Sequence, residues 1–506
     1  MEASIGSLEG PDTSAFSDGD GPDVTVAESD AADDSRALEP YDLIVLGGGS
    51  AGSACAAEAV KLGHQRVLLI NADKLGGLCI LRGCMPTKAL LHPTDLLHDL
   101  RHGEDIGVRA ENVSVDVPLL FQRKREMVER FQRAKIGGME NGGYEILFGR
   151  ARFSGPDRVR IEGGPMDGKE LTAKAFLVAT GSRQFVPPLP GLEDVPYLTS
   201  DEVLEQEELP ESIIALGAGA IGLEFSTFYA GLGVRTTLVN RTPVLNRGES
   251  PDLSAQVQRA LEHGGVRVVA PCTIHEARRN GERVELVVER DGLREIVSAD
   301  ALLLATGRVA NLEDLGLEEA GVEIERGRPV LDDALRTTNP KVFVAGDATG
   351  DRLILHTGNA EGRHVARNLK RHSADVKLTP WREAIPVSAT FTHPPYAEVG
   401  LTETAARNQG LDVVTAQKNW ANQGRGIVMN TLPEGAFIKL IAERRTARLI
   451  GAQILGPRAD DLIHILSTAM FYSGTARDLL AMPWYHPTLS EGVLEMAREV
   501  AQKAEA

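Results

Sequence analysis

Residues 76–88 read GGLCILRGCMPTK and place two cysteines, Cys79 and Cys84, five positions apart. In a regular α-helix five residues rise about 7.5 Å, just beyond the roughly 7 Å limit between the Cα atoms of a disulfide. A bridge between them therefore needs a distorted first helical turn, and such strain makes a disulfide easier to reduce. The stretch contains residues that allow this distortion, namely glycines for close backbone approach and a proline tolerated near a helix start: Gly76, Gly77, Gly83 and Pro86.

A structural disulfide or a zinc site is the alternative for such a pair. Zinc ligands usually come as closer pairs with a second pair elsewhere, whereas Cys55 and Cys272 each stand alone. Four cysteines in 506 residues do not form a secreted disulfide framework. They fit a reducing cytosol, where a cysteine pair is more often catalytic. Cys55 lies among alanines, and this pattern predicts that it is a small core residue. Cys272 has no partner motif.

Two glycine turns predict nucleotide sites. The first follows the apolar run 41–46, precedes a helical stretch and a second strand, and has Gly-x-Gly-x-x-Gly spacing: Gly47, Gly49 and Gly52. The second follows the strand 213–216 and precedes a helix and the strand 234–239: Gly217, Gly219 and Gly222. Glycines let the backbone approach a pyrophosphate at a helix N-terminus. Two dinucleotide sites in one chain imply electron transfer between two nucleotides.

The pattern in residues 76–88 resembles the redox-active disulfide of class I pyridine nucleotide-disulfide oxidoreductases, which include dihydrolipoamide dehydrogenase, glutathione reductase and mercuric reductase. The resemblance covers nearly the whole chain after residue 40. It implies an α/β fold with two Rossmann-like domains that bind FAD and NAD(P), and a C-terminal α+β dimerisation domain. We expect five segments: a disordered acidic tail (1–39), the first part of the FAD domain (40–190), the NAD(P) domain (191–313), a return to the FAD domain (314–383) and the dimerisation domain (384–506).

The resemblance also assigns catalytic roles. Cys84 lies nearer the flavin, and Cys79 exchanges with the substrate. Lys88 lies near the reactive flavin nitrogen and pairs with Glu224. In the motif His-Pro-x-x-Ser-Glu, His486 is the acid/base residue and Glu491 orients it. The histidine acts on the disulfide of a second subunit. A homodimer is therefore expected as the active unit.

Further cofactor contacts follow from the same resemblance. At the first nucleotide, Asn71 ends a strand where the family has an acid, and Gly77 lies beside the disulfide. Thr180 and Gly181 form a closing turn, and the Asp347 carboxylate binds the ribityl chain. At the second they are Asn240, Arg241 and Gly307. The choice between NAD and NADP stays open, since Gly222 favours the dihydrolipoamide dehydrogenase branch and the missing acid at Asn240 favours NADP.

Charge limits the partners and the location. The net charge of −18 argues against nucleic acid or an anionic membrane as partner. Eleven acidic residues precede Pro40, and the stretch lacks the features of a secretory or transit peptide, so we expect a cytoplasmic protein. His98 and His102 have the helical spacing of a metal-binding pair, but no third ligand is evident. We expect no metal site and solvated histidines.

The leading hypothesis is a dihydrolipoamide dehydrogenase-like enzyme that passes electrons from a dithiol or lipoyl group through FAD to NAD(P). The rival is an NADPH-dependent reductase of glutathione or another low-molecular-weight disulfide. A mercuric reductase is disfavoured because the C-terminus, REVAQKAEA, carries no cysteine pair. A flavoprotein that only docks in a complex is the non-enzymatic alternative. The sequence specifies neither the substrate, nor the direction of electron flow, nor the role of the tail.

Overall fold

The computed structural model describes residues 39–242, 251–370, 377–382, 385–431 and 435–505. Residues 1–38 of the predicted acidic tail lie outside this part of the chain, as does Arg247, a further arginine after Arg241 in the sequence. The chain divides into two units, Met1–Pro40 and Tyr41–Ala506, and all described helices and strands belong to the second unit.

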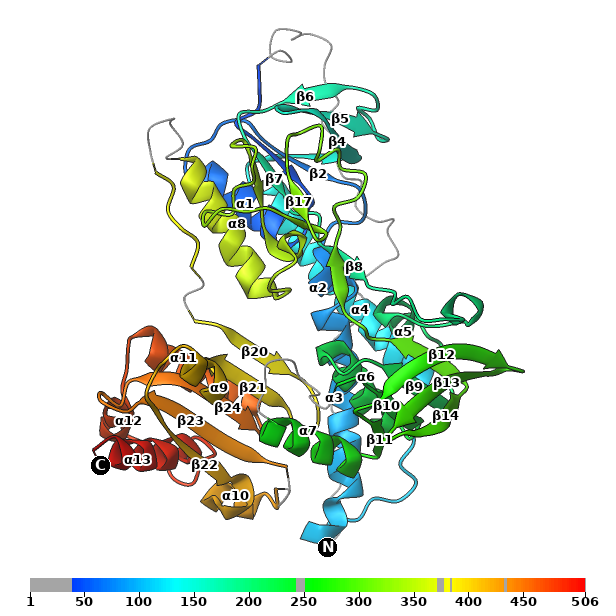
Figure 1. The fold of residues 1–506 in the computed structure, drawn as a ribbon, viewed down its shortest axis with the longest axis vertical. Helices are drawn as coiled ribbons and strands as arrows, with labels where there is room; N and C mark the ends of the chain where they lie inside the picture. The colour runs from blue at the N-terminus through cyan, green and yellow to red at the C-terminus, as the bar shows by residue number, and fades with distance from the viewer. Residues whose placement is uncertain (1–38, 243–250, 371–376, 383–384, 432–434, 506) are drawn as a thin grey trace, which may run out of the picture. The chain divides into compact units, whose positions relative to one another are not determined.

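The first nucleotide-binding sheet has five parallel strands in the order β19-β7-β1-β2-β3. Their bounds are β1 (Leu43–Leu46), β2 (Val67–Asn71), β3 (Glu145–Phe148), β7 (Phe176–Val178) and β19 (Val342–Val344). The central strands are buried throughout, as parallel strands covered on both faces require. The helices α1 (Ser50–Lys61) and α8 (Leu355–Leu369) lie side by side (Figure 1). Their closeness depends on Gly362, because a Cβ atom there would lie 2.2 Å from the Ala51 carbonyl oxygen.

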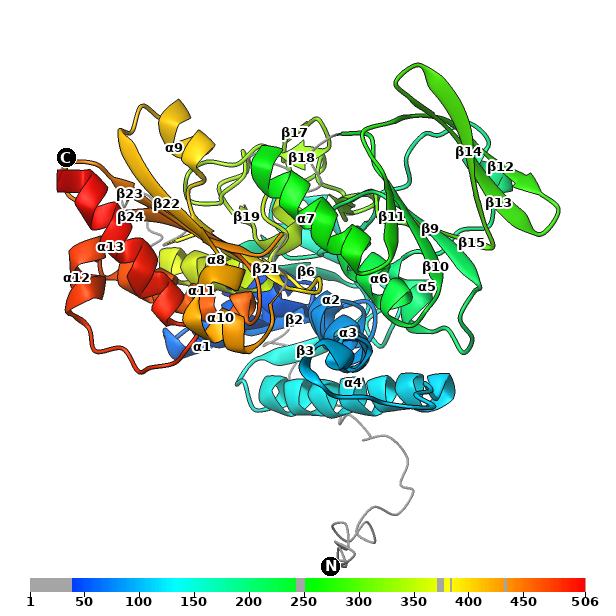
Figure 2. The same cartoon turned by 90° about the horizontal axis from the view of Figure 1, so that it is seen from below.

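Three helices leave this sheet after β2. They are α2 (Gly77–Leu81), α3 (Cys84–Arg101) and α4 (Val117–Glu140). The last begins where the Asp116 carboxylate accepts a hydrogen bond of 3.0 Å from the Leu119 N–H. Figure 2 shows α4 lying alongside α3, and the two helices are in contact. A one-turn 3₁₀ helix, η2 (Gly103–Ile106), follows α3.

Short antiparallel strands occur between the nucleotide-binding segments. The strands β4 (Arg150–Gly155), β5 (Arg158–Glu162) and β6 (Glu170–Thr172) form one small sheet. β8 (Ser182–Gln184) pairs with β16 (Arg308–Ala310). The chain segments that follow β7 and β15, one from each nucleotide-binding sheet, therefore lie beside each other. A further hairpin consists of β17 (Ile324–Glu325) and β18 (Arg328–Pro329).

The second nucleotide-binding sheet has four parallel strands in the order β11-β10-β9-β15. They are β9 (Ser212–Leu216), β10 (Arg235–Val239), β11 (Val266–Val269) and β15 (Ala301–Leu304). Its helices are α5 (Ser200–Leu204), α6 (Ala220–Gly231) and α7 (Pro251–His263), and η3 (Leu192–Asp194) precedes them. An antiparallel sheet of β12 (Thr273–Asn280), β13 (Arg283–Arg290) and β14 (Leu293–Ala299) completes this region.

The C-terminal region is built on a five-stranded antiparallel sheet in the order β20-β21-β24-β23-β22. Its strands are β20 (Val387–Thr390), β21 (Tyr396–Gly400), β22 (Val413–Asn419), β23 (Phe437–Glu443) and β24 (Leu449–Leu455). Its helices are α9 (Glu403–Asn408), α10 (Gly424–Val428), α11 (Ala459–Phe471), α12 (Ala476–Ala481) and α13 (Glu491–Glu505), with η5 (Trp420–Asn422) between β22 and α10. Trp420 is fully buried in its core.

Two parallel sheets and a separate antiparallel sheet with helices confirm the predicted α/β class with a C-terminal α+β part. Among the described helices, none is long and apolar enough to cross a membrane.

Candidate active site

The two cysteines lie on consecutive helices that are separated by a sharp break. Cys79 is in α2, and Cys84 is the first residue of α3. Between them the backbone leaves helical geometry, with φ −143° at Arg82 and φ −136° at Gly83. A Cβ atom at Gly83 would lie 2.9 Å from the Leu78 carbonyl oxygen and 3.2 Å from the Cys79 Cα. The distorted turn expected from the sequence is therefore present, and it requires glycine.

Both cysteines are thiols in the structure, and they share a hydrogen bond. This bond lowers the pKa of Cys84 to about 7, with help from the Lys88 ammonium and against the effect of burial. The same bond and burial raise the pKa of Cys79. When the pair loses a proton, the thiolate therefore forms on Cys84, and Cys79 keeps its proton.

The remaining cysteines differ from this pair. Cys55 is fully buried in α1, and burial raises its thiol pKa. Cys272 is also buried, with its sulfur near the Asn240 carbonyl oxygen, and its pKa is raised mainly by burial. A buried thiol with a raised pKa is chemically inert. Cys55 is a core residue, as the sequence predicted.

A half-buried ion pair lies beside the cysteines. The Lys88 Nζ lies 2.8 and 2.7 Å from the two carboxylate oxygens of Glu224 in α6. Glu224 is 5% exposed. One of its oxygens also accepts a hydrogen bond of 3.1 Å from the backbone N–H of Phe391, and the Lys88 ammonium lies 4.6 Å from the centre of the Phe391 ring. Segments far apart in the sequence thus hold the lysine one helical turn from Cys84.

The three glycines of the first nucleotide turn have two different roles. Gly47 has φ +112°, and a Cβ atom there would lie 2.3 Å from the Ala179 carbonyl oxygen. A Cβ atom at Gly52 would lie 1.9 Å from the Gly47 carbonyl oxygen, so the protein itself requires both glycines. At Gly49 the nearest atom to such a Cβ is 4.0 Å away, on Gly77. The open space at Gly49, before the N-terminus of α1, suits a pyrophosphate.

The second nucleotide turn repeats this division. Cβ atoms at Gly217 and Gly222 would lie 2.4 and 1.9 Å from carbonyl oxygens of Ala305 and Gly217 respectively. At Gly219 nothing lies within 4 Å of such a Cβ atom. This glycine also has ordinary extended geometry, φ −77°, at the N-cap of α6. The space beside Gly219 therefore fits a second pyrophosphate.

The asparagines at the ends of β2 and β10 already form hydrogen bonds within the protein. The Asn71 side-chain oxygen accepts a hydrogen bond of 2.9 Å from the Gly48 N–H, and its amide donates to the Asp73 carbonyl oxygen. Asn71 therefore fixes the first glycine turn, and one N–H and one lone pair are left for a ribose hydroxyl. In the second site, the Asn240 amide donates hydrogen bonds of 3.1 Å to the carbonyl and hydroxyl oxygens of Thr242. Arg241 is exposed.

Sequence reasoning identified Asp347 but missed its partners. The Ser182 hydroxyl donates a hydrogen bond of 2.6 Å to Asp347, which lies in η4 (Gly346–Thr349), directly after β19. Arg308 donates through Nε to the Ser182 hydroxyl, at 2.8 Å, and through Nη2 to the Ser182 carbonyl, at 2.6 Å. Burial lowers the pKa of Arg308. The pairing of β8 with β16 brings Ser182 and Arg308 together, and no local sequence signal indicates it.

The predicted closing turn lies at this junction as well. The Thr180 hydroxyl donates a hydrogen bond of 2.6 Å to the Asn311 carbonyl oxygen, and the Asn311 N–H donates to the Gly181 carbonyl oxygen at 2.9 Å. Gly181 and Gly307 have φ +76° and +110°, which favour glycine, and neither would bring a Cβ atom within 4 Å of another group. The junction connects the exits of the two nucleotide-binding sheets.

The predicted acid/base pair lies in the C-terminal region. The His486 Nδ1 lies 3.0 Å from both carboxylate oxygens of Glu491, and the Thr488 N–H donates to Glu491 at 3.0 Å. The bond from Thr488 and then the bond from His486 lower the pKa of Glu491. The His486 side chain is 76% exposed. Within the described residues its hydrogen-bond partner is Glu491, and neither cysteine contacts it.

Comparison with known proteins matches residues 41–371 to the family described as pyridine nucleotide-disulphide oxidoreductase, and residues 386–497 to the dimerisation domain of that family. The chain belongs to this family. As members depend on FAD and use NAD(P)H, FAD and NAD(P) are its cofactors. The open spaces at Gly49 and Gly219 fit their pyrophosphate groups.

Relatives of this oxidoreductase have different names. It is 33% identical over 456 residues to a mercuric reductase of Bacillus cereus, covering 90% of this chain and 70% of the relative. It is 32% identical over 462 residues to the dihydrolipoyl dehydrogenase of Geobacillus stearothermophilus, covering 91% and 96%. The solved structure of the HOCl-induced flavoprotein disulfide reductase RclA from Escherichia coli matches with a TM-score of 0.78 at 26% identity, covering 91% of this chain and 100% of that chain. These similarities define the family and not the substrate.

Proposed function

We propose that this chain is a dihydrolipoamide dehydrogenase-like enzyme, which oxidises a small dithiol or lipoyl group and passes the two electrons to NAD(P). The single observation that carries the proposal is the pairing of Cys79 and Cys84 across the break between α2 and α3, where their shared hydrogen bond and then the Lys88 ammonium lower the pKa of the Cys84 thiol. A stabilised thiolate is a good leaving group in thiol–disulfide exchange. A disulfide bond between Cys79 and Cys84 is therefore readily broken and reformed.

In the proposed reaction, Cys79 and Cys84 begin as a disulfide. A substrate thiolate attacks the Cys79 sulfur, the bond between the two cysteines breaks, and Cys84 leaves as the thiolate. The second substrate thiol then attacks the mixed disulfide, and Cys79 leaves and takes up a proton. The substrate is oxidised to its disulfide, and the enzyme pair is reduced by two electrons. FAD, when bound, supplies the electron relay from this pair to the nicotinamide.

Proton transfer is assigned to His486. The substrate thiol must lose its proton before it attacks, and an imidazole oriented by Glu491 is suited to accept it. His486 is exposed in one chain, and the stretch of chain before it carries exposed apolar side chains: Phe471, Tyr472, Met482 and Tyr485. Such a group favours an interface. With the dimerisation domain, these features support a homodimer in which each chain provides His486 to the other chain's cysteines.

Cofactor contacts are assigned from the same geometry. We propose that FAD lies along Gly47, Gly49, Gly52 and Asn71, near Gly77 and Lys88, with Asp347 binding its ribityl hydroxyls. We propose that NAD(P) lies along Gly217, Gly219 and Gly222, towards Asn240, Arg241 and Gly307. An exposed arginine without an acid at the end of β10 suits a 2′-phosphate, which supports an NADPH-dependent disulfide reductase as the second candidate.

Mercury reduction has less support, although relatives carry that name. A soft metal ion needs accessible thiolates to deliver it. Besides Cys79 and Cys84 the chain has Cys55 and Cys272, and both are buried.

The test is the steady-state rate of NADH and NADPH oxidation by the FAD-loaded protein, with lipoamide, glutathione disulfide or Hg²⁺ as acceptor. Turnover with lipoamide at a kcat/KM at least roughly 100-fold above the other acceptors supports the proposal. Preference for NADPH with glutathione disulfide establishes the second candidate. Turnover with Hg²⁺ alone contradicts both candidates.

A further inference from the structure

Four histidines from three segments meet on the side of α3 that faces the second nucleotide-binding region and the C-terminal region. His98 and His102 lie near the end of α3, His263 ends α7, and His393 lies between β20 and β21. The ring centroid of His98 lies 3.9 Å from that of His393 and 4.1 Å from that of His102. His263 lies 5.3 Å from His102 and 6.4 Å from His98. The expectation of solvated histidines on α3 is therefore met only in part, because His98 and His102 are half-buried where distant segments pack against them.

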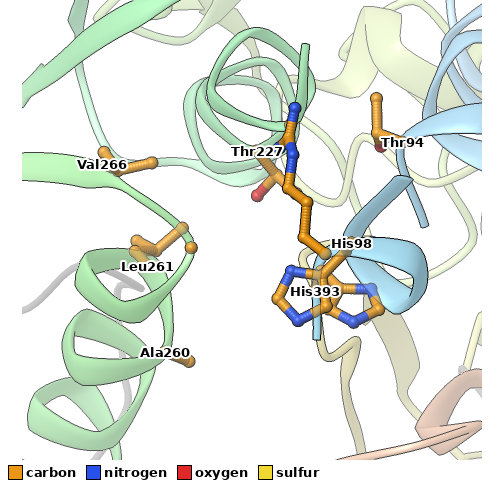
Figure 3. A pocket seen from close by; sticks show the side chains of 10 residues that line it. Thr94, His98, Thr227, Ala260, Leu261, Val266 and His393 are labelled. Carbon is orange, nitrogen blue, oxygen red and sulfur yellow. The ribbon is translucent and has the colours of Figure 1, made fainter. Parts of the chain in front are cut away.

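Figure 3 shows the His98 and His393 rings against each other beside Thr94 of α3 and Thr227 of α6. A small cavity of about 20 Å³ adjoins them, with room for about one water molecule. In the described part of the chain, no three His, Cys, Asp or Glu side chains are arranged to hold a metal ion. The rings therefore lie in contact beside a cavity with little room for solvent.

The charges around His98 oppose its protonation. Burial first, and then His393, His102, His263 and Arg101, lower the pKa of His98 to about 3. α6 and α7 contribute uncharged groups to the cavity, among them Thr227 and Ala260. The acidic partner in the described cluster is Asp95, whose carboxylate lies 3.0 Å from the His393 Nδ1. Protonation of His98 would place a positive charge beside Arg101 in this half-buried cluster, and the Asp95 carboxylate contacts His393 and not His98, so the packed arrangement favours a neutral His98.

His393 is connected to the Lys88–Glu224 pair by a short, well-held segment. Phe391, two residues before it, donates its N–H to Glu224 at 3.1 Å and places its ring 4.6 Å from the Lys88 ammonium. Between them Thr392 is buried, and its hydroxyl donates a hydrogen bond of 2.7 Å to the Pro394 carbonyl oxygen. Movement of His393 away from His98 therefore moves Phe391 relative to Lys88.

We propose that the contact between His98 and His393 is an acid-sensitive latch that holds the segment 391–393 against the Lys88–Glu224 pair and releases it at mildly acidic pH. The effect of the latch on turnover rests on the role proposed above for Lys88. The existence of the latch does not depend on that role. Lys88 in turn stabilises the Cys84 thiolate, so release of the segment lowers the activity of the thiol pair.

The size of the response follows from linkage. An open, solvated imidazole has a pKa of about 6.5, and in the closed contact His98 has a pKa of about 3. Between these values opening takes up a proton, so acid favours the open form and neutral pH the closed form. The ratio of open to closed forms then rises roughly tenfold between pH 7.5 and pH 5.5.

The test is hydrogen–deuterium exchange of the FAD-loaded full-length protein, without substrate, at pH 7.5 and 5.5, with rates corrected for intrinsic exchange. Peptides across 391–400 of the wild-type protein should open roughly tenfold more at pH 5.5, and peptides from β23 should not change. His98→Phe keeps a ring against His393 but cannot titrate, so its change should be less than about twofold. The matched control is His92→Phe, exposed on the same helix, which should respond like the wild type.

An equal response in the wild type and in His98→Phe, or no response in the wild type, overturns the latch. If His98→Phe does not fold, His98→Gln decides, because a glutamine at this position cannot titrate either. The response of that variant should also be less than about twofold, and a response equal to that of the wild type refutes the proposal. Since exchange is measured without turnover, failure of the latch is distinct from failure of the proposed function.

Discussion

The Lys88 ammonium lies 2.7 Å from a carboxylate oxygen of Glu224, in an ion pair that connects α3 to α6 beside the reactive cysteines. The two residues are 136 positions apart in the sequence. The Lys88 charge lowers the pKa of the Cys84 thiol, and the Glu224 charge raises it. The pair therefore sets the thiolate population through two opposed effects.

Lys88→Met should raise the pKa of Cys84 from about 7 by roughly one pH unit, because it removes the nearby positive charge. Glu224→Gln is the matched opposite change, and it should lower the pKa. The thiolate forms as pH rises through the pKa, so at pH 7 the first variant has less thiolate than the wild type and the second has more. The measurement is an NMR titration of ¹³C-labelled cysteine in the reduced protein, where four cysteines give four signals. Identical midpoints in all three proteins would refute this electrostatic role.

The glycine turns can be tested by a pair of alanine substitutions. Gly219→Ala adds a methyl group where no atom lies within 4 Å, so the melting temperature should shift by no more than a few degrees. The KM for NAD(P)H should rise at least roughly tenfold, because the methyl group occupies the pyrophosphate space. Gly222→Ala brings a Cβ atom to 1.9 Å from the Gly217 carbonyl oxygen and should destabilise the protein by roughly 2 kcal/mol or more. An unchanged KM for Gly219→Ala would place the nucleotide elsewhere.

If each subunit provides His486 to the cysteines of the other, two inactive variants should complement each other in a mixed dimer. His486→Gln should reduce turnover roughly 100-fold or more, as loss of an acid/base group does. Cys84→Ser should abolish it. A mixed dimer of the two variants contains one site with intact cysteines and an intact histidine, so random mixing should restore about a quarter of the wild-type activity. Activity of the mixture no higher than that of its parents would show that His486 does not act on the other chain.

Much of the site was predictable because its chemistry lies in short local patterns. The distorted turn between Cys79 and Cys84 and the two glycine turns have fixed spacing, and the structure contains each of them. His486 and Glu491 are five residues apart and contact each other. In these cases neighbouring residues set the geometry, and the rest of the fold only positions it.

Contacts between distant segments could not be predicted in this way. Arg308 meets Ser182 only because β16 pairs with β8. Phe391 reaches Glu224 through its backbone N–H, which any residue type except proline could provide. Asn71 ends its strand as predicted, but its side-chain oxygen binds the Gly48 N–H, a bond that the strand pattern does not reveal. Such contacts depend on tertiary packing, for which spacing along the chain provides no signal.

The most direct test of the central claim is whether electrons from nicotinamide reach Cys79 and Cys84. The oxidised, FAD-loaded protein is denatured in N-ethylmaleimide before and after anaerobic addition of one equivalent of NADH or NADPH, and the labelled cysteines are identified by mass spectrometry. Before reduction, label should occur on Cys55 and Cys272 alone, and after reduction on Cys79 and Cys84 as well. Equal labelling of Cys79 and Cys84 before and after reduction would contradict the account.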